Sequence, residues 1–174
     1  MNELSWIAEG RKLLGVHEET SEAKVLAMWD DAFAAVGTPR EADKPIWNTG
    51  GTAWCGGFVA ACLARAGLGV RIPKSFPMAR SWAKAGTALS KPAYGCVVVF
   101  SRDGGGHVGF VVGKDKAGNL MVLGGNQSNQ VCIKPFSKAR VLAYRWCGKT
   151  GAPAEGRYDL PVLSSDGKVS TNEA

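Results

Sequence analysis

The feature that most constrains the fold is a change in apolar periodicity near residue 95. Before it, apolar residues recur at three- and four-residue spacing, as on one face of an α-helix. After it, short β-branched runs alternate with glycine-containing turns, as in hairpin-linked strands. The expected helices cover residues 4–15, 21–36 and 55–66, with a shorter one near 78–85. The expected strands lie at 97–100, 107–112, 120–123, 131–133 and 141–144.

Helices followed by strands predict an α+β fold, with N-terminal helices packed on a small antiparallel β-sheet. The 174 residues suffice for one domain with its own core, which we place at residues 1–147. Turn formers and helix breakers between residues 37 and 52 predict a loop ahead of the third helix. Residues 148–174 lack periodicity and are rich in Gly, Ser, Pro and charge, so we expect a flexible C-terminal tail.

Charge is distributed unevenly along the chain. Residues 46–150 hold fourteen Lys and Arg against two Asp and Glu, a net charge of +12. A segment this basic favours an anionic partner, and nucleic acid, anionic lipid and cell-wall polymer all meet that requirement. No stretch approaches the ~18 apolar residues that span a bilayer, so stable membrane insertion is not expected. The first residues lack the basic and apolar regions of a signal peptide.

The five cysteines are odd in number and form no Cys-x-x-Cys pair. This spacing gives no support to a zinc site or a redox motif. Most of these cysteines are expected to be small buried hydrophobic residues in a protein made in a reducing compartment.

Cys55 differs from the other cysteines in its position. It follows Trp54 where a glycine-rich loop turns into an apolar helix. Unpaired N–H groups and the helix dipole at such a terminus lower a thiol pKa and can hold an oxyanion. This predicts a nucleophile, although an isolated cysteine is more commonly a buried structural thiol.

His107 and Asn126 are the residues that could activate such a thiol. His107 follows three glycines and opens an apolar strand, a position from which a general base can face a cleft. Asn126 ends the next strand, where it could accept a hydrogen bond from the second ring nitrogen of His107. The alternatives are a solvent-facing histidine and a turn asparagine with positive φ. Together the three residues follow the order of a Cys-His-Asn site.

Three strings then carry a family resemblance. They are Trp-Cys-Gly-Gly-Phe-Val at 54–59, Gly-His-Val-Gly-Phe-Val-Val-Gly at 106–113 and Leu-Gly-Gly-Asn-Gln-Ser-Asn at 123–129. In this order they resemble the CHAP group of the papain-like NlpC-type superfamily, and more closely a compact phage endolysin branch of that group. The resemblance covers about residues 4–146.

This resemblance implies a papain-like fold and hydrolysis of an amide in bacterial peptidoglycan. The bond would be the muramoyl–L-alanine amide or one in the stem or cross-link peptide. Cys55 would be the nucleophile, His107 the base and Asn126 the orienting residue. Trp54 would line the cleft beside the nucleophile, and Gln127 would bind substrate or assist Asn126. Neither a metal nor an organic cofactor is required.

The resemblance also implies a setting for the protein. We expect a monomer, made in the bacterial cytoplasm without a signal peptide and active in the periplasm or cell wall after release. Its partner would be peptidoglycan and not nucleic acid.

Two departures from the family pattern are visible. Many CHAP members carry an acidic residue two positions before the asparagine, where this chain has Gly124. Relatives also often have Gly-Asp before the first buried strand, where this chain has Gly95-Cys96, and we interpret Cys96 as a packing residue.

Two other functions remain open from the sequence. One is an antibacterial amidase effector delivered by a secretion machine. The other is a non-catalytic module that binds cell wall or nucleic acid, although no helix-turn-helix, zinc or RNA-recognition signature is present.

Overall fold

The computed structural model describes residues 1–38 and 52–173, so most of the loop predicted at 37–52 lies outside the described residues. The α-helices are α1 (Ser5–Lys12), α2 (Glu22–Ala35) and α3 (Cys55–Arg65). The strands are β1 (Thr87–Leu89), β2 (Val97–Arg102), β3 (Gly105–Lys114), β4 (Leu120–Gln127), β5 (Gln130–Phe136) and β6 (Val141–Trp146). Short 3-10 helices are η2 (Gly69–Arg71), η3 (Ala79–Lys84), η4 (Lys138–Arg140) and η5 (Glu155–Tyr158).

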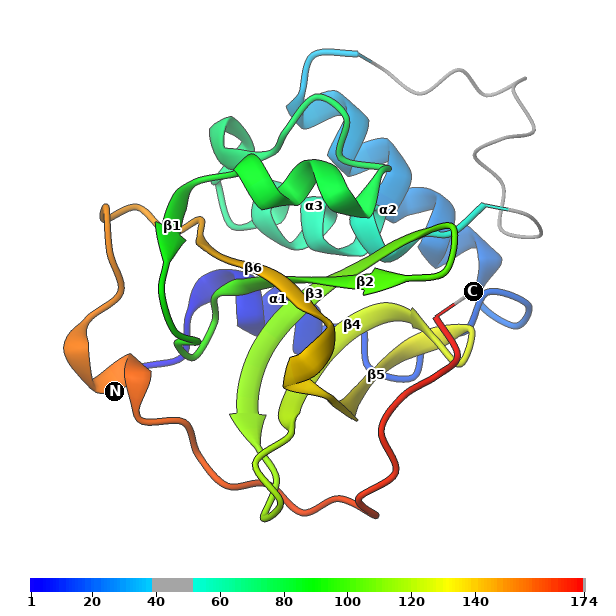
Figure 1. Cartoon of the computed structure of the whole chain (residues 1–174). Coiled ribbons are helices and arrows are strands. Elements are labelled where there is room, and N and C mark those ends of the chain that lie inside the picture. Colours follow the sequence, from blue (N-terminus) through cyan, green and yellow to red (C-terminus); the bar gives the residue numbers. More distant parts are fainter. Residues whose placement is uncertain (39–51, 174) are drawn as a thin grey trace.

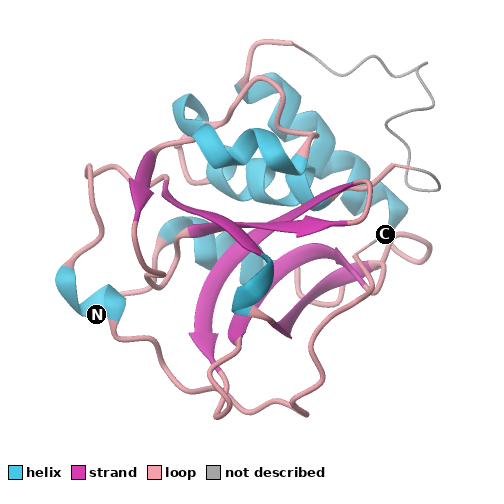
Figure 2. Ribbon diagram, in the orientation of Figure 1, coloured by secondary structure: helices cyan, strands magenta, loops and turns pink. Residues whose placement is uncertain are grey.

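The six strands form one sheet in the order β1-β6-β2-β3-β4-β5, and every neighbouring pair is antiparallel. Figure 1 and Figure 2 show helices α2 and α3 grouped together beside this curved sheet. The predicted α+β class, with helices packed on an antiparallel sheet, is therefore confirmed. Strand β1 was not expected, because three residues with little burial give no periodic signal.

Helix α3 is the centre of the core. Its residues from Cys55 to Leu63 are all buried, and it packs on α1, α2, β3 and β4. A side chain at Gly56 would place Cβ 2.0 Å from the carbonyl oxygen of Phe76. A side chain at Gly57 would place it 3.1 Å from the Trp29 ring. The two glycines after Cys55 therefore let neighbouring elements approach the first turn of α3.

The β2–β3 hairpin is tighter than the sequence predicts. Three glycines separate Asp103 from His107 in the sequence, but Arg102 pairs with Gly105 and Ser101 with Gly106. Only Asp103 and Gly104 form the turn, and Gly104 has the positive φ of 74° that such two-residue turns favour. The two remaining glycines extend β3, which places His107 opposite Phe100.

Residues 148–173 lie along the domain, whereas the sequence predicts a flexible tail. Leu163 donates its N–H to Lys114, and Ser170 donates to Pro135. Farther on, the N–H of Ser128 donates to the carbonyl of Asn172, so the segment ends beside the β4–β5 turn (Figure 1). Backbone hydrogen bonds of this kind need no apolar periodicity, which explains why the sequence does not reveal them.

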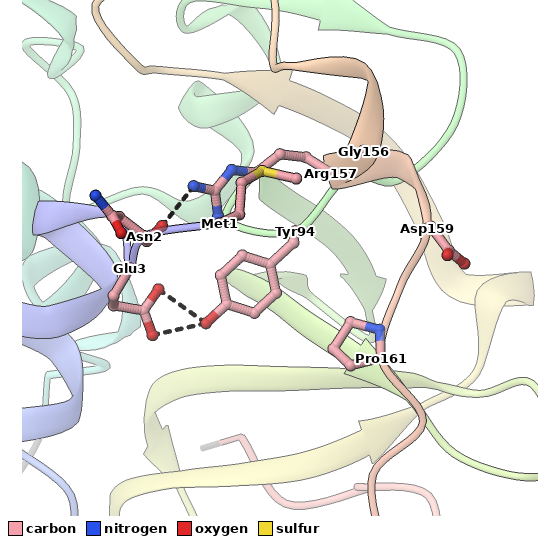
Figure 3. A pocket seen from close by; sticks show the side chains of 8 residues that line it. All are labelled: Met1, Asn2, Glu3, Tyr94, Gly156, Arg157, Asp159 and Pro161. Atoms are coloured by element: carbon pink, nitrogen blue, oxygen red, sulfur yellow. Dashed lines mark hydrogen bonds between the residues drawn. The ribbon is translucent and has the colours of Figure 1, made fainter.

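A cavity of about 260 Å³ lies where the N-terminal residues meet η5 (Figure 3). There the Tyr94 hydroxyl donates to the Glu3 carboxylate, and Arg157 donates to the carbonyl of Asn2. None of the predicted site residues lines this cavity. Among the described residues, no helix combines the length and apolar character needed to cross a membrane.

Candidate active site

Cys55 is the first residue of α3, as the sequence predicts. The thiol is buried, with 2% of the residue exposed, and it lies against the backbone of Val108, the residue after His107. Backbone groups of Val108, Gly56 and Cys55 itself lie near the sulfur and act to lower the pKa of the thiol. The fold therefore brings the start of α3 and the start of the apolar part of β3 together around one sulfur atom.

The electrostatic environment of Cys55 differs from the sequence-based expectation. Burial raises the pKa of the thiol, and this effect outweighs the backbone hydrogen bonds and the positive charge of Arg102, which lower it. A helix N-terminus alone would lower a thiol pKa, but desolvation disfavours the charged form more strongly here. Cys55 is therefore a neutral thiol at neutral pH.

His107 is completely buried within a stack of aromatic rings. Its ring lies parallel to Phe136, at 2° and 5.2 Å between centroids, and it also stacks with Phe100 at 6.3 Å. Burial lowers the pKa of His107 to about 4. The Gln127 hydrogen bond and the Glu173 charge oppose this shift, whereas the charges of Arg102 and Arg140 add to it. The imidazole is therefore neutral at neutral pH and can accept a proton.

The orientation of His107 is set by Gln127. The Nε2 atom of His107 lies 3.0 Å from Oε1 of Gln127, whose Nε2 donates to the carbonyls of Val122 and Cys132. Because these two bonds fix the amide with its oxygen toward the imidazole, we assign the proton of the neutral ring to Nε2. The other nitrogen, Nδ1, is buried and has no hydrogen-bond partner among the described residues, so its lone pair is free.

Asn126 does not make the hydrogen bond to His107 that the sequence suggests. It is buried with a φ of 57°, and its side-chain atoms have no hydrogen-bond partner among the described residues. The β4–β5 register shifts between Gly124 and Gln127, which marks a bulge at this position. The bulge disrupts the alternation of side chains along β4, so Gln127 and not Asn126 reaches the imidazole.

Gly124 provides the space that Gln127 occupies. A Cβ at Gly124 would lie 2.1 Å from Oε1 of Gln127 and 3.3 Å from Nε2 of His107. Any side chain at this position would therefore displace the Gln127 amide. Many CHAP members carry an acidic residue at this position. In this chain the side-chain amide of Gln127, three residues later, occupies the space beside His107 instead.

Trp54 and Gln127 have no exposed surface for substrate in this structure. Trp54 is 1% exposed, and its indole Nε1 donates to Oε2 of Glu18 at 2.8 Å. Its ring lies against Gly125, where a Cβ would come within 2.8 Å. Gln127 is completely buried by the contacts described above. The contacts of Trp54 therefore fix the chain directly before Cys55, and Gln127 contacts the His107 ring instead of solvent.

The remaining cysteines and acidic residues offer no competing centre. All five cysteines are free thiols, and the described ranges contain no cluster of three or more His, Cys, Asp or Glu that could bind a metal. Burial raises the pKa of Cys96 to about 12 and that of Cys147 to about 12. These two thiols are unreactive packing groups, as expected for Cys96.

The buried neutral His107 predicts a loss of stability in acid. The unfolded chain binds the histidine proton below the ordinary pKa of 6.5, but the folded chain binds it only near 4. Folding stability should therefore fall as the pH drops from 6.5 to 4, by up to about 3 kcal/mol from this residue. Urea unfolding across this range should show a smaller loss for His107→Gln than for the wild type. Equal losses would contradict the buried neutral imidazole.

Comparison with known protein families matches part of the chain. Residues 47–126 match the family model of the CHAP domain, a range that includes Cys55 and His107 and ends at Asn126. This match supports a CHAP-type fold and the class of cysteine- and histidine-dependent amidases and endopeptidases. No curated protein and no solved structure matches the chain.

Proposed function

We propose that this chain is a peptidoglycan hydrolase that cleaves an amide bond through Cys55 and His107. The observation that carries the proposal is the arrangement of these two residues within the CHAP match. The thiol lies at a helix N-terminus, beside the strand that holds a neutral imidazole with one free nitrogen.

The proposed reaction is acyl transfer. Nδ1 of His107 takes the Cys55 proton while the sulfur attacks the amide carbonyl, and backbone N–H groups at the start of α3 stabilise the oxyanion. The C–N bond then breaks, and His107 returns its proton to the leaving amine. Water attacks the resulting thioester and restores the thiol. During both steps Gln127 accepts from Nε2 and keeps the imidazole in the required orientation.

The bond class is tested by digestion of purified peptidoglycan. The wild-type chain is expected to release soluble fragments, and their masses and new amino termini identify the bond. A free L-alanine amino terminus indicates an amidase, whereas a new terminus within the stem or cross-link indicates an endopeptidase. Binding to the polymer without fragment release would instead favour a non-catalytic wall-binding module.

We further propose that the enzyme is a phage endolysin acting in the periplasm or cell wall after release, as a monomer. The support is the likeness of the strings around Cys55, His107 and Asn126 to a compact endolysin branch. Genomic context separates this setting from a secreted antibacterial effector. A neighbouring holin gene is expected for an endolysin, and a neighbouring immunity gene would contradict it.

A further inference from the structure

Two arginines beside the candidate active site hold one glutamate of the C-terminal segment, Glu173. Arg140 approaches Glu173 with Nη1 2.9 Å from Oε1 and Nη2 3.3 Å from Oε2, the two-pronged geometry with which guanidinium binds carboxylates. The Glu173 side chain is only 3% exposed. Arg102 donates to the backbone carbonyl of Glu173. A carboxylate is thus desolvated in a site built to receive it.

The site is rigid because other contacts fix Arg140. Its Nε donates to the carbonyl of Ser101 at 3.0 Å, and its Nη1 donates to the carbonyl of Ser170 at 3.1 Å as well as to the carboxylate. The guanidinium also lies over the rings of Phe100 and Phe136, 5.9 and 5.8 Å from their centroids. Such fixation reduces the entropy lost when a ligand binds.

The site also has unused binding capacity. The Nε of Arg102 is buried and has no partner among the described residues. A cavity of about 600 Å³ adjoins both arginines and Glu173, and it is also lined by Ser101, Asp103, Thr171 and Asn172. Because an unpaired buried donor is costly, a ligand that supplies an acceptor here would gain affinity.

The distance from this site to His107 fits a peptide substrate. The imidazole is 5.2 Å from the Phe136 ring, and that ring is 5.8 Å from the Arg140 guanidinium. The imidazole and the guanidinium are therefore at most about 11 Å apart, the span of about three extended residues. A carboxylate within three residues of the cleaved amide can reach the arginines.

We propose that Arg140 and Arg102 form the subsite for a free carboxylate of the peptidoglycan stem peptide, and that Glu173 occupies this subsite in competition with substrate. This inference rests on the proposed function and names the group that the enzyme recognises. The Glu173 carboxylate acts as an internal ligand, because the substrate carboxylate requires the same Arg140 guanidinium.

The test uses the full chain with single substitutions. Glu173→Gln weakens the internal ligand and is expected to lower KM by about tenfold on a stem peptide whose D-glutamate carboxylate is free. Arg140→Gln should raise KM on this peptide but not on the D-isoglutamine counterpart, so the preference for the free acid disappears. Glu155→Gln, which removes an exposed carboxylate from the same segment, is the matched control and should change neither value.

The outcomes that overturn the inference are specific. A lower kcat or a higher KM for Glu173→Gln would show that Glu173 supports the site instead of competing for it. An equal effect of Arg140→Gln on the KM of both peptides would show that Arg140 has a structural role and does not bind the carboxylate. Arg140→Lys keeps the positive charge, and thermal unfolding of each variant shows whether it is folded.

A binding readout separates this inference from the proposed function. In a Cys55→Ala background, affinity for the free-acid stem tetrapeptide is measured by calorimetry with and without Glu173→Gln. Tighter binding with the second substitution supports the subsite even if the wild type cleaves no wall. Unchanged affinity overturns it even if cleavage is observed.

Discussion

Cys55→Ala is expected to lower kcat for peptidoglycan amide hydrolysis by about 10⁴-fold or more, because no acyl-enzyme can form without the sulfur. Binding of peptidoglycan should remain, since the substitution removes one small buried atom and no charged or hydrogen-bonding surface group. Release of soluble amine from a stem-peptide substrate measures kcat, and co-sedimentation with the polymer measures binding.

Cys62→Ala is the matched control for this prediction. Cys62 lies on the same helix as Cys55 and is also buried. Burial raises the pKa of its thiol far above the usual range, and no described contact joins it to His107. Its replacement should leave kcat unchanged. Full activity in Cys55→Ala would exclude Cys55 as the nucleophile. A comparable loss in Cys62→Ala would show that the effect of Cys55→Ala reports loss of a buried thiol and not of the nucleophile.

Gln127→Leu is expected to lower kcat by about 10³-fold with a smaller change in KM. The substitution leaves Nε2 of His107 without an acceptor, so the proton is no longer held on Nε2 and the lone pair on Nδ1 is no longer assured. It also leaves the carbonyls of Val122 and Cys132 without the amide donor, which should reduce the free energy of unfolding by about 1–3 kcal/mol.

Two readouts separate positioning of His107 from loss of stability. Nitrogen NMR of the imidazole should show the proton on Nε2 in the wild type and a mixture of tautomers in Gln127→Leu. Gln130→Leu, on the other side of the same hairpin, is the matched amide-to-leucine control and should keep both kcat and the tautomer. If Gln127→Leu is folded and retains the wild-type kcat, Gln127 does not position the base.

The main elements of the fold could be predicted from the sequence because their apolar residues follow regular periods. Helix α3 begins at Cys55 as predicted, and strands β2 and β3 contain the predicted runs. The path of residues 148–173 could not be predicted, because backbone hydrogen bonds and the Arg140–Glu173 pair hold that segment. Isolated polar contacts of this kind leave no pattern in sequence.

The candidate site could be predicted only in part, and the reason is local backbone geometry. The position of Cys55 follows from a helix start, and that of His107 from the start of the apolar run within β3. The partner of His107 depends on a bulge that turns Gln127 inward and on the open space at Gly124. The positive φ of Asn126 agrees with its turn-like surroundings in sequence, but the side chain that the bulge directs to the imidazole depends on the backbone geometry of that bulge.

Trapping of the acyl-enzyme tests the central claim most directly. The wild-type chain is mixed with a soluble stem-peptide substrate, quenched in acid within a turnover, digested and analysed by mass spectrometry. We expect the peptide containing Cys55 to gain the mass of the acyl half of the substrate as a thioester. Hydrolysis that proceeds with no adduct, or with an adduct on another residue, would contradict it.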